Sequence, residues 1–212
     1  MKAMKRILVV DDHAVVRDGV KKIFEVQNCA VAFGEASTVS EALRLASEKA
    51  WDVAVLDISL GDRSGLDLLK ELKQLRPRLP VLILSMHSEE RYARRAFKAG
   101  ASGYITKDTP SIELVKAIDK VIEGGRYVSP SLAERLVLDL GGDGDRPSHE
   151  LLSDREFEVL RLIASGKTVS EIADILSLSV NTISTYRARI LEKMNMKTNA
   201  ELTHYAIRNQ LA

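Results

Sequence analysis

Residues 1–128 alternate short runs of apolar, mostly β-branched residues with longer stretches whose apolar residues recur at helical spacing. Continuous apolar runs are typical of strands that are buried on both faces, and the helical spacing is typical of amphipathic helices. Five strands alternating with five helices predict an α/β fold, a doubly wound five-stranded parallel sheet with helices on both faces. The predicted strands are residues 6–10, 30–36, 52–57, 81–85 and 103–107.

The sequence changes character after this region. Residues 128–149 begin with a short helical piece and continue into "GGDGDRPS", which cannot support a hydrophobic core and indicates an interdomain linker. The following residues contain no strand pattern, and Ser153 with Glu156 three positions later predicts a capping box at the start of a helix. We therefore predict two domains, residues 1–127 and an all-α four-helix domain over residues 150–212.

Composition restricts the class of protein. The 212 residues are 45% hydrophobic and 29% charged, with a net charge of +1, as in globular proteins. No apolar run approaches the ~20 residues of a membrane helix, and "MKAMKR" leads into the first strand without the cleavage site of a secretory signal. The single cysteine, Cys29, cannot form an internal disulfide. These features predict a cytoplasmic protein with no membrane partner.

Polar side chains follow four of the predicted strands: Asp11 and Asp12, Asp57, Ser85, and Lys107. The carboxyl ends of parallel strands meet at one edge of the sheet, where ligands bind. Each aspartate alone could start a turn or cap a helix. Three clustered carboxylates, however, repel one another and raise each other's pKa unless a cation lies among them, and their oxygens suit Mg²⁺. The sequence therefore predicts a Mg²⁺ site at this edge, with the Lys107 ammonium beside it.

The arrangement resembles the receiver domain of two-component response regulators, which has a flavodoxin-like fold. Four motifs have the order and spacing of that family: "ILVVDDH" at 7–13, "VLDISLGDRSGLDLL" at 55–69, "LILSMHSEE" at 82–90 and "KAGASGYITKD" at 98–108. The resemblance covers residues 5–125. It implies a domain that accepts a phosphoryl group from the phosphohistidine of a sensor histidine kinase.

The resemblance also implies a role for individual residues. Asp57 would be the phospho-acceptor, Lys107 and Ser85 would each contact a phosphoryl oxygen, and Tyr104 would be the switch aromatic whose burial follows the movement of Ser85. Mg²⁺ would be bound by Asp12, Asp57 and the backbone carbonyl of Ser59, with Asp11 acting through water. The family commonly has Pro-Gly where this chain has Gly61 and Asp62, and Ser59 and His87 occupy variable positions that influence the lifetime of the aspartyl phosphate.

The C-terminal region, "LSDREFEVLRLIASGKTVSEIADILSLSVNTISTYRARILEKM", resembles the LuxR-type helix-turn-helix domain of the NarL/FixJ response regulators, and most of all their GacA/UvrY branch. Residues 170–177 and 180–194 would be the scaffold and recognition helices. By position, Ser184, Thr185 and Ala188 would face bases. The basic side chains of Arg187, Arg189 and Lys193 would contact phosphates or neighbouring guanines. The complete set of expected DNA-binding residues is Asn181, Thr182, Ser184, Thr185, Arg187, Ala188, Arg189 and Lys193.

The leading hypothesis is a phosphorylation-controlled transcription factor, a regulator rather than a dedicated enzyme, that binds promoter DNA as a homodimer. A phosphohydrolase also uses an aspartate after a parallel strand, but it normally has a second aspartate where this chain has Ser59. A dinucleotide-binding domain would need a glycine-rich loop in place of "DDHAVV". Two further alternatives remain open, namely DNA binding that is independent of phosphorylation, and a C-terminal domain that docks to a protein.

Overall fold

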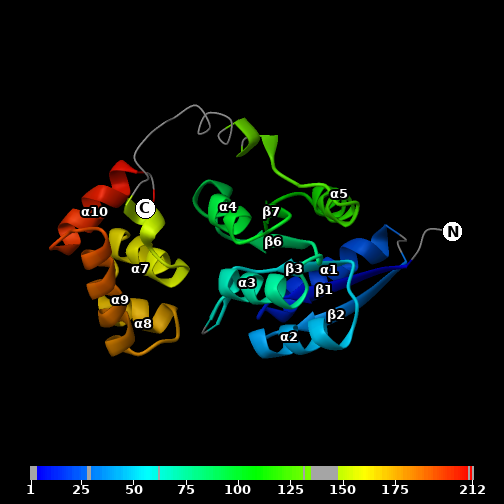
Figure 1. Ribbon diagram of the computed structural model, residues 1–212, viewed down its shortest axis with the longest axis horizontal. Coiled ribbons are helices and arrows are strands. Elements are labelled where there is room, and N and C mark those ends of the chain that lie inside the picture. Colours follow the sequence, from blue (N-terminus) through cyan, green and yellow to red (C-terminus); the bar gives the residue numbers. More distant parts are fainter. Residues whose placement is uncertain are drawn as a thin grey trace. The chain divides into compact units, whose positions relative to one another are not determined.

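The computed structural model describes residues 4–27, 30–61, 63–130, 132–134, 148–209 and 211 (Figure 1). Its contacts divide the chain into two compact units, Met1–Gly141 and Gly142–Ala212. Residues 135–147 of the predicted linker lie outside the described residues.

A five-stranded parallel sheet forms the centre of the first unit, with the strand order β2-β1-β3-β6-β7. The strands are β1 (Lys5–Val10), β2 (Val31–Ala36), β3 (Val53–Leu56), β6 (Val81–Ser85) and β7 (Gly103–Thr106). The helices between and after them are α1 (Ala14–Val26), α2 (Val39–Glu48), α3 (Gly65–Leu75), α4 (Glu89–Lys98) and α5 (Ser111–Ile122). The predicted parallel α/β fold is confirmed.

The two faces of the sheet are buried by different helices. Alternate side chains of a strand point to opposite faces. Ile7, Val9 and Val55 therefore share one core with Phe24 of α1 and Ile118 of α5. The intervening residues of β1 and β3 are equally buried and point to the other face, where α2 contacts β1 and α3. Burial on both faces explains why these strands are continuously apolar.

One element was not predicted. The loop after β3 contains a short antiparallel pair, β4 (Ser59–Leu60) with β5 (Arg63–Ser64). Gly61 has a φ of 48° at the turn between these strands, a left-handed conformation that glycine adopts without steric cost.

The second unit is helical, as predicted. A 3₁₀ turn, Ser148–Leu151, precedes the four helices α7 (Asp154–Ala164), α8 (Val169–Ile175), α9 (Val180–Lys193) and α10 (Asn199–Arg208). Each α-helix begins after a serine or threonine whose hydroxyl accepts a hydrogen bond from the backbone, and the predicted capping box of Ser153 and Glu156 is present. Their apolar faces meet around Phe157, Leu160 and Ile190.

Candidate functional site

The strand ends bring the predicted polar residues together at one edge of the sheet. Asp11 follows β1, Asp57 follows β3, Ser85 ends β6 and Lys107 follows β7. Asp11, Asp57 and Ser85 are at most 3% exposed. Buried polar groups need partners, because burial without a hydrogen bond is costly.

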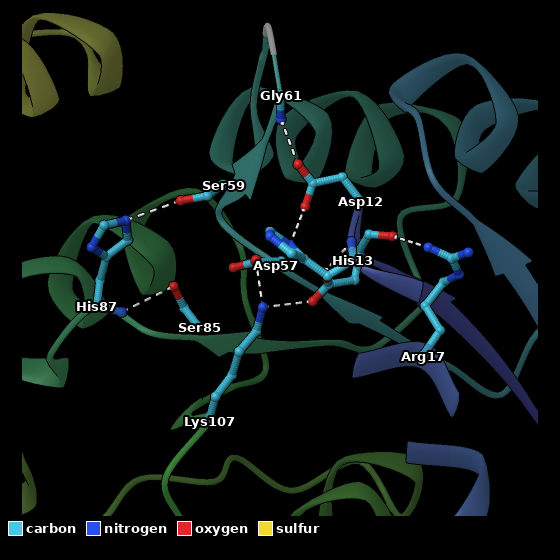
Figure 2. Close-up of polar contacts among 10 residues, drawn as sticks. Asp12, His13, Arg17, Asp57, Ser59, Gly61, Ser85, His87 and Lys107 are labelled. Atoms are coloured by element: carbon cyan, nitrogen blue, oxygen red, sulfur yellow. Dashed lines mark hydrogen bonds and ion pairs between the residues drawn. The ribbon is translucent and has the colours of Figure 1, made fainter. Parts of the chain in front are cut away.

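Lys107 joins two of the carboxylates. Its Nζ lies 2.7 Å from Oδ2 of Asp57 and 2.7 Å from Oδ2 of Asp11, and Figure 2 shows the ammonium pointing toward Asp57. Burial raises the pKa of Asp57, and the nearby Asp11 carboxylate adds to this effect, against the opposing action of Lys107. Burial lowers the pKa of Lys107, but its bonds to Asp11 and Asp57 outweigh this effect, so the net pKa shift is upward. One cation thus partly neutralises two buried acids.

Asp12 and His13 complete an acidic cluster beside Asp57. Asp12 accepts a hydrogen bond from the Gly61 backbone N–H at 3.1 Å, and His13 Nδ1 lies 2.7 Å from Asp12 Oδ1 (Figure 2). Possible ligand atoms of Asp11, Asp12 and His13 all lie within 4.8 Å of one another. No role for His13 was predicted from the sequence, although its position directly after the two aspartates was a usable signal.

The residues at this edge fit a hard divalent cation. Oδ1 of Asp57 is buried without a hydrogen-bond partner, although its sister oxygen contacts Lys107. A buried carboxylate oxygen that lacks a partner is the kind of atom that a metal ion satisfies. The neighbouring carboxylates of Asp11 and Asp12 supply the oxygen ligands that Mg²⁺ prefers.

Ser85 and Tyr104 both contact the backbone of His87. The Ser85 hydroxyl accepts a hydrogen bond from the His87 N–H at 3.2 Å, and the Tyr104 hydroxyl donates to the His87 carbonyl at 2.8 Å. The His87 ring stacks on Tyr92, with 4.5 Å between ring centroids, and its Nε2 lies 3.1 Å from the Ser59 hydroxyl. His87 therefore links the strand end at Ser85 to the loop after Asp57. The sequence placed both Ser59 and His87 among the positions that influence the aspartyl phosphate, but it did not indicate that their side chains are in contact.

Gly65 fixes the backbone at the end of β3. Its N–H donates to the Ile58 carbonyl at 2.6 Å. A Cβ atom at Gly65 would lie 1.9 Å from the carbonyl oxygen of Asp57, closer than any real contact. Only glycine allows α3 to begin this close to Asp57.

The exposed face of α9 in the second unit carries most of the side chains that we expect to contact DNA. Ile183 and Ile190 are fully buried on its other face. Two of the expected residues, Thr182 and Arg187, are half-buried. The other six are exposed: Asn181, Ser184, Thr185, Ala188, Arg189 and Lys193.

Two of the basic side chains on α9 have partners within their own unit. Arg187 Nε donates to Asn199 Oδ1 at 2.6 Å, and Lys193 Nζ lies 2.6 Å from Oε2 of the buried Glu156. Burial acts to raise the pKa of Glu156, but hydrogen bonds from Lys193 and Ser153 outweigh it and lower the pKa overall. Arg189 has no ion pair or side-chain hydrogen bond with any described residue.

Comparisons with known proteins agree with both units. Residues 7–119 match the response regulator receiver domain family. Residues 150–206 match the luxR family of bacterial regulatory proteins. The chain therefore belongs to the response regulators, with a receiver domain and a LuxR-type DNA-binding domain. Among the helices that the structure describes, none is both long and apolar enough to span a membrane.

Within this family the chain is similar to UvrY and GacA, as the sequence suggested. Response regulator UvrY of Escherichia coli K12 is 32% identical over 209 residues, which cover 98% of this chain and 96% of the relative. Response regulator GacA of Pseudomonas viridiflava is 34% identical over 207 residues, or 97% of each chain.

Solved structures extend the comparison. A two-component response regulator of the LuxR family from Aurantimonas is 35% identical, with a TM-score of 0.61. The match covers 66% of this chain and 100% of the Aurantimonas chain. The response regulator RcsB in its DNA complex is 25% identical, with a TM-score of 0.58. The match covers 96% of this chain and 98% of the RcsB chain.

Proposed function

We propose that this protein is a transcription factor controlled by phosphorylation of Asp57 by a sensor histidine kinase. The observation that carries the proposal is the environment of the Asp57 carboxylate. One oxygen lies 2.7 Å from the Lys107 ammonium, and the other is buried without a hydrogen-bond partner. A carboxylate oxygen without a hydrogen-bond partner among the described residues is available to a metal ion or to a phosphorus atom.

In the proposed reaction, an oxygen of Asp57 attacks the phosphorus of a phosphohistidine. A P–O bond forms to Asp57, and the P–N bond to the kinase histidine breaks. Phosphoryl transfer requires little covalent chemistry from the protein beyond positioning and charge neutralisation. Lys107 is held at the site by Asp11 and Asp57, so it can neutralise a phosphoryl oxygen, and the Ser85 hydroxyl can donate to another.

Mg²⁺ is the proposed cofactor, held by Asp12, Asp57 and the backbone carbonyl of Ser59, with Asp11 acting through water. The bound cation would offset the negative charge that gathers at the phosphoryl group. Asp12 suits this role because the Gly61 N–H and His13 fix its orientation, while its side chain keeps 32% exposure. His13 orients Asp12 in this proposal.

The proposed switch connects Ser85 with Tyr104 through His87. A phosphoryl group adds roughly −1.5 to −2 charges and new acceptor oxygens at Asp57. If the Ser85 hydroxyl turns to donate to the phosphoryl group, its hydrogen bond with the His87 N–H weakens. The Tyr104 hydroxyl, which is bonded to the carbonyl of the same residue, then loses a fixed partner. This segment is the two-state element that phosphorylation would bias.

The output would be binding of promoter DNA by a homodimer, with α9 in the major groove. We assign residues 1–127 to the receiver domain, 128–149 to the linker and 150–212 to the DNA-binding domain. Ser184, Thr185 and Ala188 would face bases, Asn181 and Thr182 would lie at the entering end of the helix, and phosphates would be contacted chiefly by Arg189. The DNA complex of the related RcsB supports this part of the proposal.

Labelling with radioactive acetyl phosphate in the presence of Mg²⁺ tests the acceptor. The wild-type chain should be labelled and Asp57→Asn should not. Asp67→Asn is the matched control, because the Asp67 side chain on α3 is 46% exposed and its ion pair among the described residues is with Lys70. Labelling of Asp57→Asn at the wild-type level would refute the assignment.

A DNA-binding measurement tests the coupling. DNA selected from a random pool by the full chain is titrated at one stated salt concentration, with and without beryllium trifluoride as a phosphoryl mimic. We expect about tenfold tighter binding with the mimic, and no change for Asp57→Asn. Equal affinity in both conditions would instead support DNA binding that is independent of phosphorylation.

A further inference from the structure

A surface cavity of about 430 Å³ lies in the receiver unit between the C-terminal ends of α2 and α3. It adjoins the segments that lead into β3 and β6, so it is at the opposite edge of the sheet from Asp57. Its volume is within the range of small-molecule pockets. The apolar part of its lining consists of Ala46, Ala50, Trp51, Leu75, Pro77 and Leu79.

The walls of this cavity are held in place by hydrogen bonds. The Trp51 indole N–H donates to the Leu45 carbonyl at 2.9 Å. The ring also lies directly on Gly34, where a Cβ atom would be 2.2 Å from it. The Arg76 guanidinium donates to the carbonyls of Ala46 and Ser47 at the end of α2. A cavity that is already formed requires little ordering when a ligand binds, which favours affinity.

Two cationic side chains besides Arg76, those of Lys49 and Arg78, line the cavity. Among the described residues, Lys49 and Arg78 form no ion pair and no side-chain hydrogen bond, in contrast to the anchored Arg76. An apolar cavity with two unpaired cations is complementary to a molecule that combines an apolar body with a negative charge. Neither cation is needed for the chemistry at Asp57.

We propose that this cavity binds a small organic acid with an aliphatic or aromatic body. The apolar part would lie against Trp51, Pro77 and Leu79, and the carboxylate would lie between Lys49 and Arg78. The receiver domain would thereby have a second input besides phosphorylation, at the other edge of the same sheet.

Trp51 is the only tryptophan in the chain, so its fluorescence reports on this cavity directly. The full-length protein is titrated with octanoate, which does not absorb where tryptophan does. We expect a saturable blue shift in the millimolar range, because the ligand displaces water from the indole. Octanamide has the same apolar body without the charge, and it should bind about tenfold more weakly, which corresponds to about 1.4 kcal/mol.

A double variant tests the two cations. Lys49→Gln with Arg78→Gln should weaken octanoate binding about tenfold and leave octanamide binding unchanged. Lys120→Gln with Arg126→Gln removes the same charge from the last turn of α5 and the segment that follows it, and should change neither. The proposal is overturned if octanoate gives no saturable shift, if octanamide binds equally well, or if the two double variants behave alike. Tighter binding of an acetylated Asp-Leu-Asp-Leu peptide than of octanoate would also overturn it, in favour of a protein segment.

Discussion

Replacement of Lys193 by glutamine separates two roles that this residue of α9 could have. The sequence suggests a contact with a DNA phosphate, whereas the structure places Lys193 Nζ 2.6 Å from Oε2 of Glu156. Each phosphate contact contributes about −0.9 to the slope of log binding constant against log salt concentration. A side chain that stays with Glu156 contributes none of this slope. Lys193→Gln should therefore leave the slope unchanged, and Arg189→Gln should reduce its magnitude by about 0.9.

The structure also sets the expected effect of Lys193→Gln on stability. The Glu156 side chain is 3% exposed, and in the variant its carboxylate keeps the hydrogen bond from the Ser153 backbone N–H. Lys193 is 39% exposed, so water screens the ion pair, and the loss should be about 1 kcal/mol rather than the 3–5 kcal/mol of a fully buried pair.

Two measurements on the full chain check this reasoning. Filter binding over a range of salt concentrations gives the slope, and urea unfolding gives the stability. Trp51 reports only on the receiver unit, so the difference between circular dichroism and tryptophan fluorescence isolates the second unit. A slope reduced by about 0.9 with unchanged stability would show that Lys193 contacts DNA and that its pairing with Glu156 is incidental.

Three further predictions concern stability and metal binding. Gly65→Ala should lower the free energy of unfolding of the receiver unit in urea by about 3 kcal/mol or more, because the new Cβ would collide with the Asp57 carbonyl. Gly19→Ala is the control: its Cβ would meet open space, so the variant should be neutral or stabilised by up to about 1 kcal/mol. Folding lowers the pKa of Glu156, so its carboxylate contributes its full stabilisation at a pH above the unfolded pKa of about 4.3. This stabilisation is lost as the pH falls through the lower folded pKa. In an acid titration followed by circular dichroism, Glu156→Gln should lack this part of the pH dependence of stability. Asp12→Asn should weaken Mg²⁺ binding at least about tenfold in calorimetry, while Asp67→Asn should not.

The sequence by itself determined the order of the five sheet strands and their helices, and which residues would meet at the sheet edge. Continuous apolar runs specify strands buried on both faces, and parallel strands necessarily share one carboxyl edge. The proximity of Asp11, Asp57 and Lys107 could therefore be predicted from the sequence alone. The start of α7 was equally predictable, because a capping box involves residues only three positions apart.

The tertiary structure decided which partner each long side chain takes. Lys193 and Glu156 are 37 positions apart, and nothing local selects between this carboxylate and a DNA phosphate. His87 likewise gained its contact with Ser59, which is 28 positions away in the sequence, only when separate strand ends were packed together. The same is true of the cavity at Trp51, whose walls come from segments about 25 residues apart. Such contacts depend on distances between elements, which periodicity along the chain does not specify.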